Sequence, residues 1–205
     1  TMDTIAATEL LKENGAHVLA LVNVVGSSLA RMADSVFYLH VGPEIGVAST
    51  KAYLGMLVGQ LLLAKHWDSS NKLDVSFDEI AKLPKLIEET MDCEKQIKDI
   101  SEKIYKKNDI YFIGRGLDYA LAAEGALKLK EISYLHAEAL AAGELKHGTL
   151  ALIEDGTPII VTASQNHLLD KTTSNVQEVI ARGAYVIAIG DNQSEKLENI
   201  SDEYV

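Results

Sequence analysis

Short and almost continuous apolar runs, each the length of a strand, constrain the fold of this chain most. Residues 17–22 (HVLALV), 158–162 (PIIVT) and 185–189 (YVIAI) are such runs, and helical patterns separate them. A strand that is apolar on successive residues is typically buried on both faces, as in parallel sheets covered by helices. The sequence therefore predicts an α/β fold built from doubly wound parallel sheets.

The αβ pattern stops once and then starts again, which predicts two domains. We expect a first domain at residues 1–72, a connecting helical segment at 73–100 and a second domain at 101–205. Asp3 is expected to cap the first helix. The elements expected in the first domain are helices at 4–14, 27–32 and 47–66 and strands at 17–22 and 35–40.

The connecting segment carries a helix start signal and a helix breaker. Ser76 and Glu79 have the spacing of a capping box, and Pro84 is expected to kink or divide the helix that follows. A second amphipathic helix is expected at 91–107. The elements expected beyond it are strands at 110–113, 158–162 and 185–189 and helices at 117–131 and 168–182. The chain starts without a strand and stops where one is beginning, so we expect both domains to be truncated.

Composition excludes several classes of function. A formal net charge of −11 argues against a nucleic-acid partner, because no basic surplus remains to neutralise phosphates. The single Cys93 excludes a disulfide framework and fits a reducing compartment. The longest apolar run, near residues 55–64, is too short to span a bilayer, and no signal peptide is visible. We predict a cytoplasmic protein with no membrane partner, no cofactor and no metal ion.

The stretch 124–148, EGALKLKEISYLHAEALAAGELKHG, carries more ionisable side chains than a packing helix needs. Lys128 and Glu131 are three residues apart, so on a helix their side chains share one face. The helix is expected to end at Ser-Tyr-Leu-His, and residues 143–148, which include His147, are expected to form a polar loop. A base, a cation and an imidazole near a helix end can move protons on a small anionic substrate. A solvated ion pair and a surface histidine are the alternative that the spacing leaves open.

Three other segments have both a ligand-binding and a plainer interpretation. Thr1 precedes a helix whose N-terminus could bind phosphate, although an ordinary helix cap explains it better. The turn at 114–116 (Gly-Arg-Gly) lies where α/β proteins place ligands, but a tight turn explains it equally well. Small residues at 44–51, with the hydroxyls of Ser49 and Thr50, suit either a ligand or a helix cap.

The amino-acid sequences of these segments resemble one known family over nearly the whole chain. EGALKLKEISYLHAEALAAGELKHG, EIGVASTKAY, GRGLDYALAAEGALKLKE and the opening Thr-x-Asp-Thr are similar, in the same order, to the isomerase half of glucosamine-6-phosphate synthases. The resemblance implies two tandem sugar-isomerase (SIS) domains, each a flavodoxin-like sandwich, in a homodimer. It also implies conversion of fructose 6-phosphate to glucosamine 6-phosphate, with ammonia from a glutaminase domain of the parent chain.

The resemblance assigns substrate contacts to three positions of the first domain. Thr1 matches the last position of a Ser-Gln-Ser-Gly-Glu-Thr loop that holds the sugar phosphate. Val47 and Ser49 match positions of a Val-Ala-Ser segment that contact the sugar. The rest of the phosphate loop and the family's Schiff-base lysine fall outside this sequence, so we expect no turnover by this fragment alone.

The resemblance also assigns chemistry to three positions of the second domain. Glu131 matches the glutamate that shuttles a proton between C1 and C2, and Lys128 matches a lysine that assists proton transfer. His147 matches the histidine that opens the sugar ring, and in the family it reaches into the partner subunit's site. The alternatives are a related phosphosugar isomerase, a glucosamine-6-phosphate deaminase, or a non-catalytic phosphosugar-binding protein with the same domain.

Overall fold

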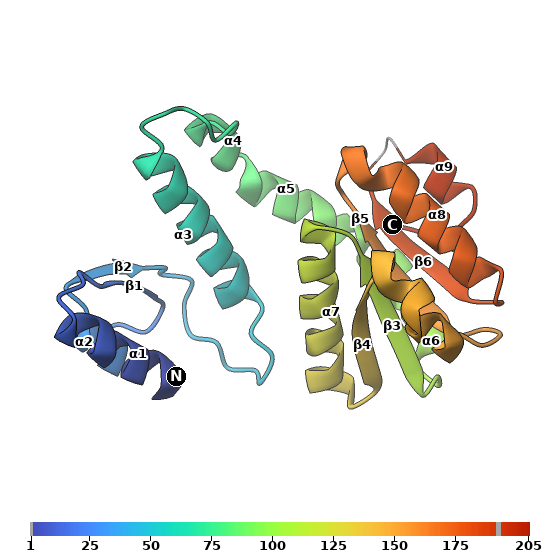
Figure 1. Ribbon diagram of the computed structural model, residues 1–205, viewed down its shortest axis with the longest axis horizontal. Coiled ribbons are helices and arrows are strands. Elements are labelled where there is room, and N and C mark those ends of the chain that lie inside the picture. Colours follow the sequence, from blue (N-terminus) through green and yellow to red (C-terminus); the bar gives the residue numbers. More distant parts are fainter. Residues whose placement is uncertain (1, 192–193) are drawn as a thin grey trace. The chain divides into compact units, whose positions relative to one another are not determined.

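The computed structural model describes residues 2–191 and 194–205 (Figure 1). The chain forms two compact units, Thr1–Glu89 and Thr90–Val205. Each unit has its own parallel sheet, of two strands in the first and five in the second. The chain is therefore α/β with parallel sheets, as predicted, whereas the predicted domain boundaries stay a prediction.

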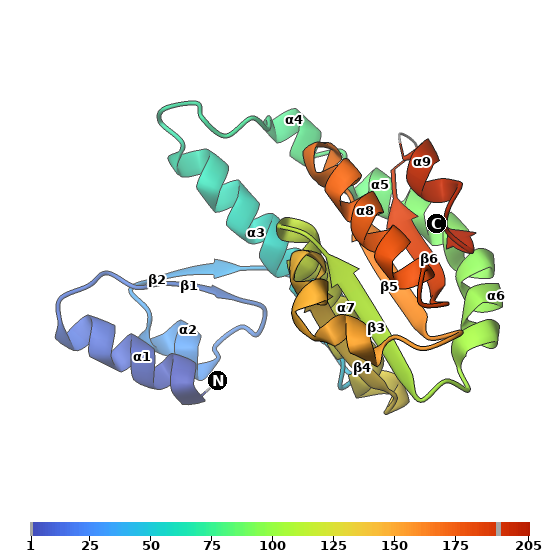
Figure 2. The ribbon, with the colours of Figure 1, turned by 45° about the vertical axis from the view of Figure 1, so that its right-hand side comes forward.

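The first unit is a two-stranded sheet with helices on both sides. Leu19 pairs with Ser35 and Val22 with Tyr38, so the two strands are parallel. Helix α3 packs closely on the sheet through Gly59, where a Cβ would lie only 3.0 Å from Leu21, and α1 and α2 lie on the other side (Figure 2). The elements are α1 (Met2–Glu13), β1 (Leu19–Val22), α2 (Ser28–Met32), β2 (Ser35–Tyr38), α3 (Lys51–Trp67), α4 (Phe77–Ile80) and α5 (Leu83–Thr90).

Several helix boundaries in this unit differ from the prediction. Helix α1 begins at Met2, so Asp3 lies inside its first turn and is not its cap. Helix α3 begins at Lys51, four residues later than predicted, because residues 47–50 adopt an irregular loop. Strand β1 is fully buried only at every second residue, Ala20 and Val22, whereas Leu19 and Leu21 on its other face are half-buried, so the predicted burial on both faces is only partial here.

The predicted helix signals of the connecting segment are confirmed. The Glu79 carboxylate accepts the Ser76 backbone N–H at 2.7 Å, and the Ser76 hydroxyl accepts the Glu79 N–H at 3.1 Å. These two bonds form the capping box of α4. Pro84 is the second residue of α5, where a helix tolerates proline, and the predicted helix is divided just before it.

The second unit is a doubly wound five-stranded parallel sheet. Its strand order is β4-β3-β5-β6-β7, so the order in the sheet reverses between β3 and β5. That order is the flavodoxin-like arrangement, whose ligand crevice lies at the carboxyl ends of the two central strands. The elements are η1 (Met91–Cys93), α6 (Glu94–Ile104), β3 (Asp109–Gly114), α7 (Leu117–Ser133), β4 (His136–Ala141), η2 (Ala142–His147), η3 (Thr149–Leu152), β5 (Pro158–Ala163), η4 (Asn166–Leu168), α8 (Leu169–Ile180), β6 (Tyr185–Gly190), α9 (Glu195–Glu198) and β7 (Glu203–Tyr204).

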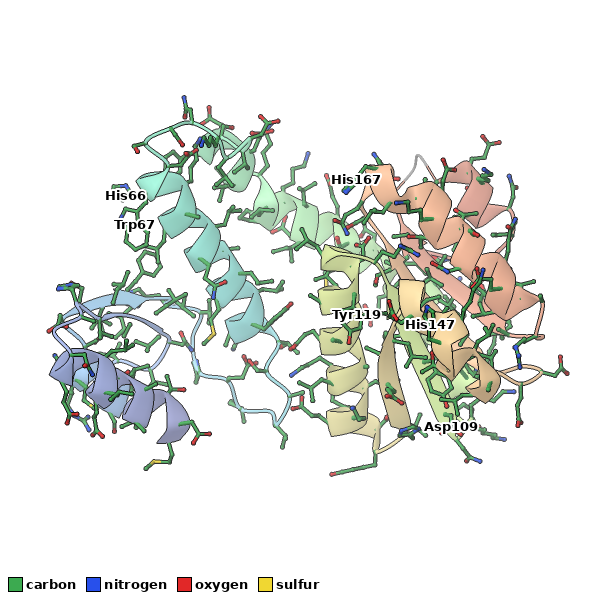
Figure 3. The ribbon with its side chains drawn as sticks, viewed as in Figure 1. His66, Trp67, Asp109, Tyr119, His147 and His167 are labelled. Carbon is green, nitrogen blue, oxygen red and sulfur yellow. The ribbon has the colours of Figure 1, made fainter. Side chains whose placement is uncertain are left out.

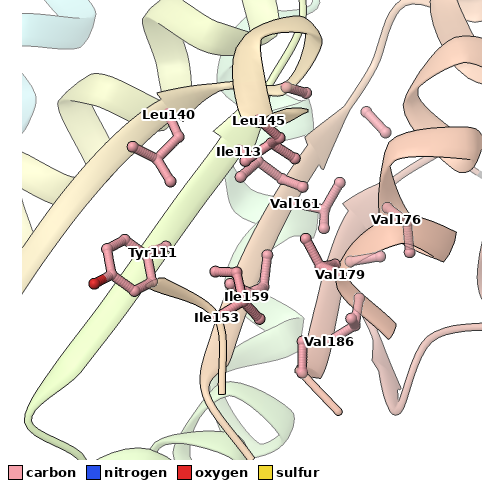
Figure 4. Close-up of a cluster of buried hydrophobic side chains, with 14 of the residues drawn as sticks. Tyr111, Ile113, Leu140, Leu145, Ile153, Ile159, Val161, Val176, Val179 and Val186 are labelled. Atoms are coloured by element: carbon pink, nitrogen blue, oxygen red, sulfur yellow. The ribbon is translucent and has the colours of Figure 1, made fainter. Parts of the chain in front are cut away.

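Two apolar clusters, one on each face of this sheet, form its core. Strand β3 supplies both, since Ile110 and Phe112 join the cluster under α6 and α7. Tyr111 and Ile113 point to the other face, into the cluster that contains Val176 of α8 (Figure 4). Alternate residues of one strand thus pack against different helices. The run 185–189 behaves in the same way, with Val186 in one cluster and Ile187 in the other, which confirms its predicted burial on both faces.

Strand β4 was not predicted, and the segment after it was predicted wrongly. Its sequence HAEALA favours a helix or a loop, but it pairs with β3 from Asp109↔His136 to Gly114↔Ala141. The segment expected to be a polar loop is instead the 3₁₀ helix η2, in which Leu145 is fully buried. Pairing with a preformed neighbour and burial against the core decide both segments.

The two units share one structural device. In the first, the Asp34 carboxylate accepts the Val18 N–H at 2.9 Å; in the second, the Asp202 carboxylate accepts the Val186 N–H at 2.7 Å. Each aspartate follows its valine by 16 residues, and its own N–H donates back to the valine carbonyl. The glycine three residues before each valine has a positive φ, 79° and 84°. Both units therefore build a helix–strand–helix–strand segment in the same way.

Candidate active-site residues

Helix α7 presents a charged cluster on one face, as the spacing predicted. The Lys128 ammonium lies 2.8 Å from the Glu131 carboxylate and 3.3 Å from that of Glu124. The hydrogen bond to Glu131 is the largest cause of the raised pKa of Lys128, and Glu124 adds to it against the opposing effect of burial. Lys128 therefore stays charged throughout the physiological pH range and holds Glu131 beside it.

Helix α7, which carries this cluster, is bounded at each end by a residue with a positive φ angle. Gly116 precedes its first residue with a φ of 54°, and Tyr134 ends it in the left-handed conformation. The predicted start at Leu117 is confirmed, and the helix extends two residues beyond the predicted end. Glu131 thus lies in the last turn, with its side chain partly exposed. A partly exposed carboxylate held by a cation can take a proton from a bound substrate and return it.

His147 lies across the sheet from helix α7, because its segment η2 packs with α8 in one apolar cluster and α7 belongs to the cluster on the other face. It is exposed on η2 (Figure 3), which follows the carboxyl end of β4. Helix α7 runs back across the sheet from the carboxyl ends of the strands, and Glu131 is about 20 Å along its axis from Leu117, at roughly 1.5 Å per residue. The structure therefore does not bring the imidazole to the Lys128–Glu131 pair within this unit.

The predicted sugar contacts belong to the first unit. Val47 is 90% exposed, and Ser49 is partly buried in the loop before α3. Thr1 lies outside the described residues. The loop is organised by Glu44, whose carboxylate accepts the Ala52 N–H at 2.9 Å and the Thr50 hydroxyl at 3.3 Å.

Glu44 is a residue whose role the sequence analysis missed. The hydrogen bond from the Ala52 backbone is the main cause that lowers the pKa of Glu44, so this carboxylate stays ionised at the N-terminus of α3. The sequence signal is the lack of an acidic residue in the first turn of α3, with Glu44 shortly before it. The N-terminus of this helix therefore already has an anionic partner.

Asp118 lies in the second unit, in the crevice at the carboxyl ends of the central strands β3 and β5. The sequence analysis missed its role as well. Its carboxylate is 1% exposed and accepts the Ser164 hydroxyl at 2.6 Å and the Ser164 N–H at 3.1 Å. The Gln165 amide donates to it at 3.3 Å and to the Arg115 carbonyl at 2.8 Å. A Cβ on Gly114 would lie 2.5 Å from the Asp118 backbone, so the Gly-Arg-Gly turn serves close strand–helix packing.

Within residues 2–191 and 194–205, no group of three or more His, Cys, Asp or Glu side chains could hold a metal ion. Over the same residues, no helix has the length and apolar character needed to cross a membrane.

The family of the chain follows from comparison with known proteins. The SIS domain family matches residues 1–65 and 103–205. The chain belongs to the SIS domain family. Its structure is similar to the C-terminal domain of glucosamine-fructose-6-phosphate aminotransferase from Francisella tularensis, with a TM-score of 0.86 and 38% identity over 100% of this chain and 60% of that one. A glucosamine-6-phosphate deaminase from Thermotoga maritima shares the fold, with a TM-score of 0.71 and 21% identity over 96% of this chain and 62% of that one.

The predicted resemblance is confirmed by relatives of known name. The chain is 48% identical over its full length to a glutamine–fructose-6-phosphate aminotransferase [isomerizing] from Caldanaerobacter subterraneus. It is 47% identical over its full length to the enzyme of the same name from Pyrococcus horikoshii. It spans 35% and 34% of the length of these two relatives.

Proposed function

We propose that this chain is the isomerase part of a glutamine–fructose-6-phosphate aminotransferase. That enzyme converts fructose 6-phosphate and glutamine-derived ammonia to glucosamine 6-phosphate, a step of amino-sugar biosynthesis. The observation that carries the proposal is the 48% identity to a relative of that name over the whole chain. The Lys128–Glu131 pair, 2.8 Å apart on α7, supports it with the groups that the chemistry needs.

The two units correspond, in this proposal, to tandem sugar-isomerase domains at residues 1–72 and 101–205, joined by residues 73–100. The second unit has five parallel strands in a doubly wound order, which supports this correspondence. The shared device at Asp34 and Asp202 supports a common design, because in both units an aspartate ties the second strand to the start of the first. The first unit would then represent the later part of its domain.

Glu131 is the residue that moves the proton. Ammonia condenses with the C2 carbonyl of the open-chain ketose and releases water to give an imine. Removal of a proton from C1, with protonation of the imine nitrogen, gives an enolamine. Return of the carbon-bound proton to C2, with loss of the C1 hydroxyl proton, leaves the aldehyde at C1 and the amine at C2, so one carboxylate serves both transfers between the carbons. Lys128 orients Glu131 through their 2.8 Å ion pair, and its charge stabilises negative charge that develops on the substrate oxygen.

The position of His147 supports a homodimer in which each site takes this histidine from the partner. Within one unit, the segment of His147 and the helix of Glu131 pack on opposite faces of the sheet. An imidazole titrates near neutrality and can exchange the protons needed to open the sugar ring. Thr1, Val47 and Ser49 bind the phosphosugar in this arrangement, and the parent chain supplies the glutaminase domain in the cytoplasm.

The proposal is tested by Glu131→Gln in the full-length parent enzyme. We expect loss of glucosamine 6-phosphate formation, measured with glutamine and fructose 6-phosphate, while calorimetry shows nearly unchanged fructose 6-phosphate binding. Glu89→Gln, which removes an exposed ion pair with Lys85 (3.4 Å), is the matched control and should keep full activity. Full activity of Glu131→Gln would refute the catalytic assignment. A wild-type enzyme that converts fructose 6-phosphate to glucose 6-phosphate and forms no glucosamine 6-phosphate when glutamine or ammonia is supplied would favour a plain isomerase.

A further inference from the structure

The η2 segment, which carries His147, is not fixed in orientation by its own internal hydrogen bonds. It is a six-residue 3₁₀ helix, a type with weak internal hydrogen bonds that is usually short. The His147 ring is exposed, and the part of the chain that the structure describes offers it no hydrogen bond. The direction of this side chain therefore depends on contacts made by the rest of η2.

Two kinds of contact fix the rotation of η2 about its axis. Ala142 and Leu145 are fully buried and face the core of the second unit. On another side, the Lys146 ammonium lies 2.9 Å from the Glu178 carboxylate of α8. With Leu145 directed inward and Lys146 tied to α8, the next residue, His147, is left pointing to solvent.

Glu178 is itself held by a buried amide. Asn175, 6% exposed, donates from Nδ2 to the other Glu178 oxygen at 3.3 Å. Its Oδ1 accepts from Arg115 Nε at 2.9 Å. A guanidinium only donates and a carboxylate only accepts, so the amide has a single favourable orientation. Arg115, Asn175, Glu178 and Lys146 thus form one polar chain from the β3–α7 turn through α8 to η2.

Arg115 also contacts the start of η2. A Cβ on Gly143 would come within 3.2 Å of Arg115 Nη2, so glycine lets the backbone pass close to the guanidinium. The polar chain therefore touches η2 at both ends, at Gly143 and at Lys146.

We propose that Asn175 and Glu178 are positioning residues that hold η2, and through it His147, at the angle that ring opening of the phosphosugar requires. This inference rests on the proposed function. Displacement of a catalytic group by about 1 Å can lower a rate by roughly 100-fold, so a loosened η2 reduces turnover without direct loss of any group that touches substrate.

Two mild substitutions in the full-length enzyme test this role. Glu178→Gln keeps an acceptor for Asn175 and removes the charge that holds Lys146, whereas Lys146→Met removes the other partner. Each should lower kcat for fructose 6-phosphate by about 3- to 100-fold, with KM nearly unchanged and the melting temperature unaltered. Asp170→Asn, also on α8, breaks an exposed ion pair with Lys196 of α9; it is the matched control and should keep the wild-type kcat.

A double-mutant cycle with His147→Ala separates positioning from a general structural effect. Once His147 is removed, Glu178→Gln should cause no further loss of kcat. An unchanged kcat in Glu178→Gln, or a loss that adds in full to that of His147→Ala, would overturn the inference while the proposed function stands. A wild-type enzyme that forms no glucosamine 6-phosphate would overturn the proposed function, and the inference with it.

Discussion

Asp118→Ala tests whether a buried carboxylate holds together the central crevice of the second unit. The wild-type side chain accepts hydrogen bonds from the Ser164 hydroxyl, the Ser164 N–H and the Gln165 amide, at 2.6–3.3 Å. Alanine removes the acceptor for all of them. The three donors come from the segment after β5, so the loss separates that segment from the start of α7.

The expected loss of stability depends on whether each hydrogen-bond donor finds another acceptor once the Asp118 carboxylate is removed. Ser164 is exposed, so its hydroxyl can turn to water, and the Gln165 amide keeps its bond to the Arg115 carbonyl at 2.8 Å. The Ser164 backbone N–H loses its charged partner, and a hydrogen bond to a charged group contributes about 1.5–3 kcal/mol. We therefore expect the free energy of unfolding of the second unit to fall by about 2–3 kcal/mol.

Native-state hydrogen exchange measures this change within the second unit. The amides of Ile113 in β3 and Val161 in β5 report its core, and their opening free energies should fall together. Asp118→Asn keeps one acceptor and should cost about half as much. Asp99→Ala, at an exposed position of α6, is the control and should change stability by less than about 0.5 kcal/mol. Opening free energies of Asp118→Ala within that same margin of wild type would refute the reasoning.

Two predictions concern pH, and their signs follow from the direction of each pKa shift. The pKa of Glu44 is lowered below its ordinary value near 4.5, mainly by the hydrogen bond from the Ala52 N–H. The ionised carboxylate therefore stabilises the fold above that value, and this stabilisation is lost as the pH falls through the folded-state pKa. Exchange protection of the first turn of α3 should therefore fall in wild type as the pH drops below about 4.5, and a Glu44→Gln variant with the same acid dependence would contradict this. Burial, followed by the hydrogen bond to Glu203, raises the pKa of Tyr185 to about 12, so the neutral phenol stabilises the second unit below pH 10 and that stability is lost from pH 10 to about 12. An ultraviolet absorbance titration should lose its most alkaline tyrosine in Tyr185→Phe, and an unchanged titration curve would rule the assignment out.

Local patterns predicted the parts of the structure that depend on few neighbours. The apolar runs at 158–162 and 185–189 lie within β5 and β6, because a strand apolar on every residue has no stable place except inside a sheet. The Ser76–Glu79 box and the Lys128–Glu131 pair also form as predicted, since both join side chains only three residues apart. Short sequence motifs, including the segment around Lys128 and Glu131, also indicated the family resemblance that the relatives confirm.

Tertiary structure decided whatever depends on partners distant in sequence. HAEALA becomes β4 because β3 offers it a ladder from Asp109 to Gly114, which outweighs its helical propensity. Helix α3 begins at Lys51 after a loop that Glu44 organises from several residues away. Asp118 meets Ser164 across 46 residues, and the sheet separates α7, which carries Glu131, from η2, which carries His147. Residue types and short spacings determined which groups are present, whereas strand pairing and the face on which each helix packs decided which of them meet, because those contacts form only when the whole sheet is assembled.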